Sequence, residues 1–278
     1  MKSFIKISAL FILFIAQASA WDVDLRPYQT RVKDQCNRNT CAYFSCTALL
    51  ESLFISKFNR YIELSEQYII HRSKAHHLHR VSEEHGDPYD ILLQLKSDSI
   101  QFMEKDVPYE KSLFEDGGPC AQFLKEPEKA PAYCFAHLPV EDLSKFKPVR
   151  YSGLEVDHMS RLWTSKTQVE IIKDRLQQQR PVVITAKVNP ENWDDKTGLA
   201  HFDKEIDDKC ESGEIFCAGH AILLVGYDDV KKQFLFKNSW GPKWGQEGYG
   251  VIGYDYIENF AYEPHSLQFN RFVGELYD

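Results

Sequence analysis

After its first twenty residues the sequence has no apolar run long enough to cross a bilayer, which takes about 20 residues. Internal repeats and low-complexity segments are also missing, and no block of like charge marks a disordered tail. The composition, 43% hydrophobic and 27% charged, is that of an ordinary globular protein. What remains is a chain long enough for one large domain or two small ones.

Positive charge is in short supply, with 33 basic against 41 acidic residues and a net charge of −8. Removing the first twenty residues removes Lys2 and Lys6 and no acid, which leaves a net charge of −10. An acidic chain argues against nucleic acid as a partner and gives no electrostatic reason to bind an anionic membrane.

The N-terminus has the pattern of a secretory signal peptide. A basic head up to Lys6 precedes the apolar run Ile7–Ala16 and the small-residue cleavage site Ala18-Ser19-Ala20. We expect residues 1–20 to be a leader rather than an uncleaved anchor. The mature chain, 21–278, then begins near Trp21 and is secreted or periplasmic.

Seven cysteines follow the leader, and an odd number leaves at least one free thiol. Export to an oxidising compartment makes disulfides plausible. Proximity in sequence favours the pairs Cys120–Cys134 and Cys210–Cys217. Cys46, inside a predicted buried helix, is expected to be an inert packed thiol.

The first half of the mature chain reads as mainly helical and the second as rich in strands. Helices are predicted from Cys41 to about Phe58, after the N-cap Ser65, from Pro88, and from the capping box at Thr167 to near Arg180. Strands are predicted over Pro181–Val188, Ala221–Tyr227, Gln233–Lys237 and Tyr249–Tyr254. This order predicts an α+β fold with a helical lobe, about 21–140, and a β-rich lobe, about 141–278, the boundary lying within 131–165.

A hairpin brings two chemically useful side chains together. The polar turn 228–232 separates two of the predicted strands, so opposed residue numbers should sum to about 458 to 460. His220 then lies opposite Asn238, Ser239 or Trp240. An amide oxygen beside an imidazole fixes the ring tautomer and leaves the other nitrogen to face a nucleophile.

Cys41 is placed to be that nucleophile. The N-terminus of a helix stabilises a thiolate through its free N–H groups and its dipole. The side-chain amide of Gln35, together with the backbone N–H of Cys41, is a candidate pair of donors for an oxyanion.

These residues carry a family resemblance. Val32-Lys33-Asp34-Gln35 with Cys41-Ala42-Tyr43-Phe44-Ser45 resembles the segment around the nucleophile in papain-like (C1) cysteine peptidases. The chain is similar to the family again at Leu64-Ser65-Glu66-Gln67, at His85-Gly86-Asp87-Pro88-Tyr89, at Val107-Pro108-Tyr109-Glu110, at Gly219-His220-Ala221, and at Lys237-Asn238-Ser239-Trp240-Gly241. The matches run in order over nearly the whole mature chain.

The resemblance implies a two-lobed fold with the active cleft between the lobes, and hydrolysis of protein or peptide substrates through an acyl-enzyme. It implies Cys41 as nucleophile, His220 as acid and base, Asn238 as the residue that orients the histidine, and Gln35 as oxyanion donor. It further implies that Gly86 hydrogen-bonds the substrate backbone. Pro88 and Ala221 would touch the pocket for the second residue before the cut, and Trp240 would shield the His–Asn contact and floor the leaving-group side.

Three features depart from the family pattern. Asn39-Thr40 replaces the usual Gly-Ser before the nucleophile, and Ala42 replaces an aromatic residue. The spacing of 179 residues from Cys41 to His220 exceeds the usual figure of about 130–150. Extra loops are therefore expected within 111–165 and 189–217, where they can shape specificity.

Other readings remain open. A catalytically silent relative would bind peptides without cutting them, and labelling by an epoxide thiol inhibitor separates it from an enzyme. A Cys–His acyl transferase or amidase would act on cell-wall peptides instead of proteins, and a long loop that blocks one end of the cleft would make an exopeptidase. His76, His77 and His79 lack the i, i+4 spacing of a helical zinc site, so we expect a solvated face there and neither a metal nor a cofactor.

The sequence also predicts how activity is controlled. Val23-Asp24-Leu25-Arg26 resembles the start of a mature papain-like domain, so we expect residues 21–278 to be active without removal of a pro-segment. Control would then come from the redox state of Cys41, from an extra loop, or from a separate protein inhibitor. Producing 21–278, adding reductant and measuring peptide turnover tests this expectation; a folded protein that stays inert until a further cleavage contradicts it.

Overall fold

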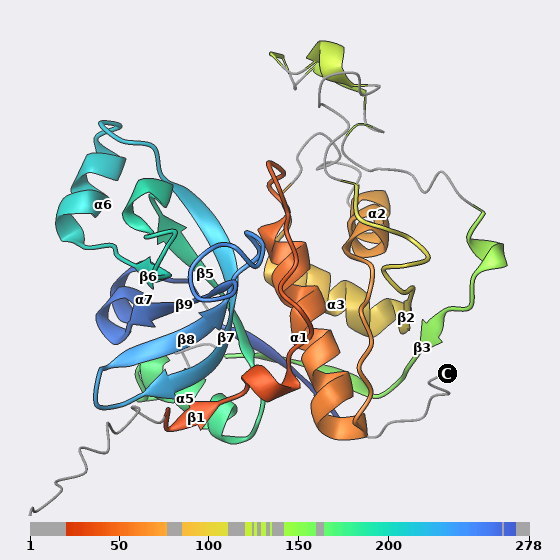
Figure 1. Ribbon diagram of the computed structural model, residues 1–278, viewed down its shortest axis with the longest axis horizontal. Coiled ribbons are helices and arrows are strands. Elements are labelled where there is room, and N and C mark those ends of the chain that lie inside the picture. Colours follow the sequence, from red (N-terminus) through yellow and green to blue (C-terminus); the bar gives the residue numbers. More distant parts are fainter. Residues whose placement is uncertain are drawn as a thin grey trace, which may run out of the picture.

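The computed structural model describes residues 21–76, 85–110, 120–123, 125–126, 129–131, 134, 142–159, 164–262 and 264–270. The predicted leader and the side chains of His76, His77 and His79 lie outside this description. Figure 1 shows three helices, α1, α2 and α3, on one side and a twisted sheet with α5, α6 and α7 on the other. The prediction of an α+β fold with a helical lobe beside a strand-rich lobe is confirmed.

Helix α1 (Cys41–Phe58) is the central element of the helical lobe. Every residue from Ala42 to Phe54 is buried, because apolar or small side chains cover almost all sides of the helix. Asn59, in the left-handed conformation with φ of 53°, ends it. The predicted bounds of this helix are confirmed.

The other predicted helix starts are also confirmed. The hydroxyl of Ser65 accepts from the backbone N–H of Tyr68 at 3.0 Å at the start of α2 (Glu66–His76), and Pro88 opens α3 (Pro88–Asp98). The capping box at Thr167 opens α5 (Gln168–Gln177). This last helix ends before the predicted Arg180, since Gln179 turns left-handed with φ of 58° ahead of Pro181.

One sheet forms the body of the other lobe, in the order β4-β10-β5-β7-β8-β9-β6. Its strands are β4 (Leu154–His158), β5 (Val182–Val188), β6 (Leu199–Ala200), β7 (Ala218–Asp228), β8 (Gln233–Lys237), β9 (Tyr249–Gly253) and β10 (His265–Phe269). The short β1 (Val23–Asp24) also pairs with β7, so this N-terminal segment lies on the strand-rich lobe and not on the helical lobe, where the sequence placed it. All pairs are antiparallel except β6 with β9.

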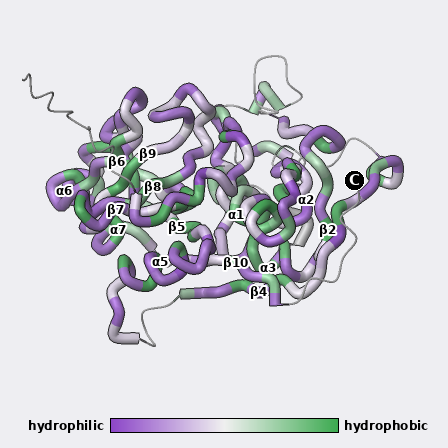
Figure 2. Tube along the Cα trace, turned by 60° about the horizontal axis from the view of Figure 1, so that its bottom comes forward, coloured by the Kyte–Doolittle hydropathy of each residue, from purple (hydrophilic) through white to green (hydrophobic). Residues whose placement is uncertain are grey.

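Several elements were not predicted from the sequence. They are β1, β4, β6 and β10, the small pair β2 (Ile100–Gln101) and β3 (Val149–Arg150), and the helices α6 (Lys204–Glu211) and α7 (Tyr254–Phe260). Helix α6 buries none of its residues, and Figure 2 shows it as mostly hydrophilic. Its apolar side is only the pair Ile206 and Cys210, partly buried against the core, which is too short a stripe to mark a helix in the sequence.

The two lobes share one continuous hydrophobic core. Leu49 and Leu53 of α1 belong to the same buried cluster as Ile184 of β5 and Leu223 of β7. A polar contact crosses the same boundary, where the hydroxyl of Ser45 donates to the carbonyl oxygen of Ala221 at 2.8 Å. The N-terminal half of α1 is thus held against the strand that carries His220. In the described part of the chain, no helix is long and apolar enough to span a membrane.

Both predicted disulfides are present, Cys120–Cys134 and Cys210–Cys217. Cys46 is fully buried in α1 and keeps its thiol, as expected. Burial raises the pKa of this thiol well above its usual value, which makes it unreactive.

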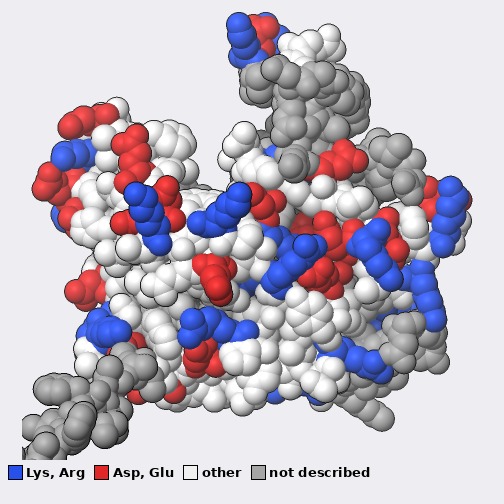
Figure 3. All heavy atoms as spheres, viewed as in Figure 1, with Lys and Arg blue, Asp and Glu red and all other residues white. Residues whose placement is uncertain are grey.

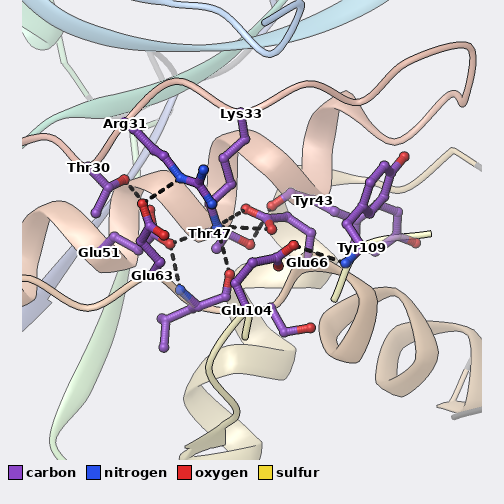
Figure 4. Close-up of polar contacts among 12 residues, drawn as sticks. Thr30, Arg31, Lys33, Tyr43, Thr47, Glu51, Glu63, Glu66, Glu104 and Tyr109 are labelled. Atoms are coloured by element: carbon purple, nitrogen blue, oxygen red, sulfur yellow. Dashed lines mark hydrogen bonds and ion pairs between the residues drawn. The ribbon is translucent and has the colours of Figure 1, made fainter. Parts of the chain in front are cut away.

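A cluster of buried charges connects the N-terminal segment of the helical lobe to α1 and α2 (Figure 4). The ammonium of Lys33 lies 3.0 Å from Glu51 of α1, 2.8 Å from Glu66 of α2 and 2.7 Å from the carbonyl oxygen of Leu64. Burial opposes the charge of Lys33, but attraction from Glu66 and Glu51 outweighs it and raises the pKa of Lys33 above its ordinary value. Since the side chains of Glu51 and Glu66 are only 1% and 2% exposed, no solvent replaces this cation.

We predict that Lys33→Met lowers the free energy of unfolding by about 3–5 kcal/mol, because it removes the ammonium that pairs with Glu51 and Glu66 inside a buried acidic cluster. The matched control is Lys204→Met, which removes a fully exposed ion pair with Asp208 and should leave the free energy of unfolding almost unchanged. Urea unfolding of both variants measures the difference. Equal midpoints for the two would contradict the structural role of Lys33.

Candidate active site

Cys41 is the first residue of α1, with Thr40 as N-cap. In Figure 1 this helix runs downward, so its N-terminal end lies at the top, where the two lobes meet. The side chain of Cys41 is half-buried, and the first N–H groups of the helix surround it. A thiol here is reachable by a ligand and lies at the positive end of the helix dipole.

His220 of β7 lies next to Asn238, which directly follows β8. The Nε2 of His220 is 2.8 Å from the Oδ1 of Asn238, and both side chains are buried. The backbone N–H of Ser239 donates to the same oxygen at 2.8 Å. Because Oδ1 accepts, Nε2 carries the proton and Nδ1 of the neutral ring is left as a base.

The hairpin that brings these residues together differs slightly from the expected register. Next to the turn the paired residue numbers sum to 461, as in Asp228 with Gln233, one more than the predicted range. A bulge between Leu224 and Gly226 restores a sum of 460 further from the turn. The ladder ends at Lys237, and the side chains of His220 and Asn238 meet just beyond it.

Gln35 is fixed beside this pair. Its Nε2 donates to the carbonyl oxygen of Arg38 at 2.7 Å, and its Oε1 accepts from the hydroxyl of Ser239 at 2.5 Å. The backbone N–H of Gln35 also donates to the carbonyl oxygen of Ser239 at 2.8 Å. One amide hydrogen of Nε2 remains for another acceptor, and the side chain that carries it is held in place.

One cavity of about 470 Å³ collects most of the predicted site residues. Those that line it are Gln35, Cys41, Gly86, His220, Ala221 and Trp240. Asn238 is buried behind His220 and does not line it. Pro88 does not line it either; it is buried in the first turn of α3, with its carbonyl oxygen 3.6 Å from the Sγ of Cys46.

Gly86 is required by packing at the wall of this cavity. A Cβ atom at this position would lie 2.7 Å from Cζ and 2.8 Å from the hydroxyl oxygen of Tyr43, and 2.8 Å from Cδ1 of Ile91. A side chain would therefore push the strand-like segment away from α1. Without one, the backbone of Gly86 approaches the cavity closely, as a segment that hydrogen-bonds an extended ligand must do.

Two tryptophans enclose the ring of His220. The Trp240 ring lies 4.6 Å from it between centroids, and the Trp193 ring lies 5.5 Å away, edge to face. The two indoles contact each other at 5.5 Å. Sequence reasoning missed Trp193, which follows a short 3-10 turn (Pro190–Asn192) in the region predicted only as an extra loop. Its one local signal was a large aromatic residue in an otherwise polar stretch.

Comparison with known proteins agrees with this geometry. A family model described as papain family cysteine protease matches residues 19–263. The chain belongs to the papain family of cysteine proteases. The resemblance inferred from the sequence motifs is thereby confirmed.

Individual relatives are distant. An uncharacterized peptidase C1-like protein of Acanthamoeba polyphaga mimivirus is 30% identical over 126 residues, which cover 44% of this chain and 37% of that protein. Procathepsin L of Felis catus is 24% identical over 245 residues, 85% of this chain and 60% of that protein. The chain spans about half the length of the curated relatives it matches.

The fold is shared with a solved structure of the same kind. The crystal structure of xylellain, a cysteine protease from Xylella fastidiosa, superimposes with a TM-score of 0.68 at 20% identity, covering 90% of this chain and 86% of that one. At this identity the similarity concerns the fold alone. It supports the two-lobed arrangement that the described residues adopt.

Burial opposes charge on both reactive groups of this papain-family site. It lowers the pKa of His220 to about 4, although the hydrogen bond with Asn238 works in the opposite direction. It also raises the pKa of Cys41, despite the lowering effect of backbone contacts with Ala221 and Ala42. Each group taken alone is thus neutral near pH 7. Among the described residues no group of His, Cys, Asp and Glu is arranged to hold a metal.

We predict that Cys41→Ala leaves His220 neutral down to a pH of about 4, because no thiolate then stabilises the imidazolium. The unfolded chain takes up this proton near pH 6.5, so the variant should lose up to about 3 kcal/mol of stability as the pH falls through this window. NMR titration of the imidazole gives the midpoint. A midpoint at or above 6.5 in the variant would show that burial does not control this histidine.

Proposed function

We propose that the chain is an exported cysteine endopeptidase that hydrolyses peptide bonds through an acyl-enzyme. Its helical lobe would comprise about 21–140, apart from β1, which pairs with β7, and its β-rich lobe about 141–278, with the cleft between them. The observation that carries the proposal is the 2.8 Å contact between His220 and Asn238 beside a cavity that Cys41 and Gln35 also line. Family membership makes proteins or peptides the substrate class.

The reaction starts with proton transfer from Sγ of Cys41 to Nδ1 of His220, because Nε2 is engaged by Asn238. The thiolate attacks the scissile carbonyl carbon and forms a C–S bond. The developing oxyanion is stabilised by the backbone N–H of Cys41 and the free amide hydrogen of Gln35. His220 then gives its proton to the leaving amine as the C–N bond breaks. Water, deprotonated by His220, hydrolyses the thioester and restores the thiol.

Both charges of the ion pair have to form together. Burial disfavours an isolated thiolate and an isolated imidazolium, but two opposite charges about 4 Å apart attract by about 4 kcal/mol at an effective dielectric constant of about 20. The N-terminus of α1 adds further stabilisation on the thiolate side. Trp193 and Trp240 keep water from the imidazolium and so preserve this attraction.

Export follows from the composition of residues 1–20 and agrees with the two disulfides, which persist in oxidising compartments. We therefore place the active protein outside the cytoplasm, in the secreted or periplasmic space. A separate protein inhibitor is a candidate partner, and neither nucleic acid nor a membrane surface is expected to bind this acidic chain.

Cys41→Ala should abolish peptide hydrolysis and leave the fold intact, because the exchange removes one sulfur atom at a helix start. Turnover of a fluorogenic peptide measures activity, and an unchanged circular dichroism spectrum verifies the fold. The matched control is Cys46→Ala, which removes a buried thiol from the same helix and should leave catalysis in place. Peptidase activity in the folded Cys41→Ala protein would refute the proposal.

The three supporting residues should differ in importance. His220→Ala should cause the largest loss of kcat, because His220 transfers protons, whereas Asn238→Ala removes only its orientation. Gln35→Ala should cost about 3 kcal/mol of transition-state stabilisation or less, since the backbone donor remains. Single-turnover rates of the folded variants test this order. Equal and complete loss in all three would argue against the assigned roles.

A further inference from the structure

Phe216 is an unusually exposed aromatic residue at the edge of the catalytic cavity. It is 74% exposed, yet it lines the same cavity as Cys41 and His220. Large apolar side chains of the fold are otherwise mostly buried in one core. Because Phe216 does not contribute to that core, its exposed ring at the cavity is a candidate contact for a bound ligand.

The loop that carries Phe216 is held firmly. The disulfide Cys210–Cys217 closes it one residue away, and Nδ2 of Asn189 donates to the carbonyl oxygen of Phe216 at 3.0 Å. The preceding helix α6 is anchored to β5 by Lys187, which pairs with Asp207 at 2.7 Å and also with Glu211. Phe216 therefore stands on a fixed support, and the entropy cost of ordering it around a ligand is low.

Side chains along the paired strands β5 and β7 alternate between the two faces of the sheet. Residues paired across antiparallel strands share a face, and every second residue returns to it. The pairs His220 with Ala186 and Ala218 with Val188 therefore lie on one face, which is the face that the two tryptophans cover at His220. The pair Ala221 with Thr185 lies on the other face.

Phe216 comes just before β7 and is not itself part of the strand. It lies two residues before Ala218, and it lines the cavity together with Val188, Pro190, Ala218 and Trp240. This wall is apolar throughout. Gly86, which is expected to bind the substrate backbone, belongs to the helical lobe, next to Tyr43 and α1. Trp240, which is expected to floor the leaving-group side, lines the cavity with Phe216, and on this ground we place Phe216 on the side where the leaving part of a substrate departs.

Charge on the same support reinforces the selection. The segment 204–214 carries five acidic residues and two lysines, and Figure 3 shows these side chains gathered on α6 beside a notch in the surface. An acidic residue just after the cut bond would meet both an apolar wall and a negative field. An apolar residue would bury surface against the Phe216 ring instead.

We propose that Phe216 is a specificity-determining residue that selects an apolar side chain at the substrate position immediately after the cut bond. The proposal rests on the peptidase function proposed above. An apolar residue that covers the exposed ring should gain about tenfold in kcat/KM over a polar residue of similar size, which corresponds to about 1.4 kcal/mol.

The test uses peptides that differ only after the cut bond, with leucine or the similarly sized asparagine there. A second pair of peptides varies only the second residue before the cut. The enzymes are the reduced wild type, Phe216→Ala, Phe216→Leu and the control Val230→Ala, which changes a 92% exposed residue at the hairpin turn. Titration with an epoxide thiol inhibitor gives the concentration of active Cys41 in each.

We expect wild type and Val230→Ala to prefer leucine about tenfold, Phe216→Leu to keep most of this preference, and Phe216→Ala to reduce it to about threefold or less. The ratio for the peptides that vary before the cut should stay unchanged in all four. An unchanged leucine preference in a fully titratable Phe216→Ala enzyme overturns the inference, as does an equal loss of selectivity on both sides of the cut. A wild type in which Cys41 neither reacts with the inhibitor nor cuts any peptide refutes the underlying peptidase function instead.

Discussion

The buried ammonium of Lys33 is the interaction on which the arrangement of the site depends. It neutralises Glu51 of α1 and Glu66 of α2 at a depth where water cannot. Glu51 also accepts from the hydroxyl of Thr30, and Thr30 in turn accepts from Nζ of Lys237 through its carbonyl oxygen at 2.9 Å. One connected set of buried ion pairs and hydrogen bonds therefore joins two helices, the N-terminal segment and strand β8.

This chain of contacts ends at the proposed catalytic groups. Lys237 is the last residue of β8, and the next residue is Asn238, which holds the ring of His220. A cavity of about 10 Å³ between α1 and this segment is lined by the charged cluster as well as by Asn238 and Ser239. Any slip of β8 against α1 would separate Lys237 from Thr30 and move Asn238 at the same time. The network thus couples the packing of the two lobes to the orientation of the imidazole, and orientation is what a proton-transferring ring requires.

The parts that could be predicted from the sequence are those set by neighbouring residues. The helix at Cys41, the cap at Ser65 and the contact of His220 with Asn238 depend on local patterns or on one short hairpin. The register next to the turn was wrong by one because Asp228, expected to belong to the turn, pairs with Gln233; the bulge at Val225 then returns the pairing to the predicted range. Strands β4 and β10, which pair with each other across more than a hundred residues, and the contact of Trp193 with His220 depend on long-range packing that no local pattern encodes. The roles of the site residues remain predictions.

Burial acts on the reactive pair in two opposite ways. It disfavours charge on Cys41 and on His220 when each is considered alone, as the directions of their pKa values show. The same exclusion of water raises the attraction between the two charges from about 1 kcal/mol in bulk water to about 4 kcal/mol at a protein-like dielectric constant. A site enclosed by Trp193 and Trp240 therefore destabilises the state in which only Cys41 or only His220 is charged. It stabilises the state in which the proton has moved from Cys41 to His220 and both are charged. An open site would tolerate either charge singly and would bind the pair less tightly, so enclosure by the tryptophans is as much a part of the chemistry as the three polar groups.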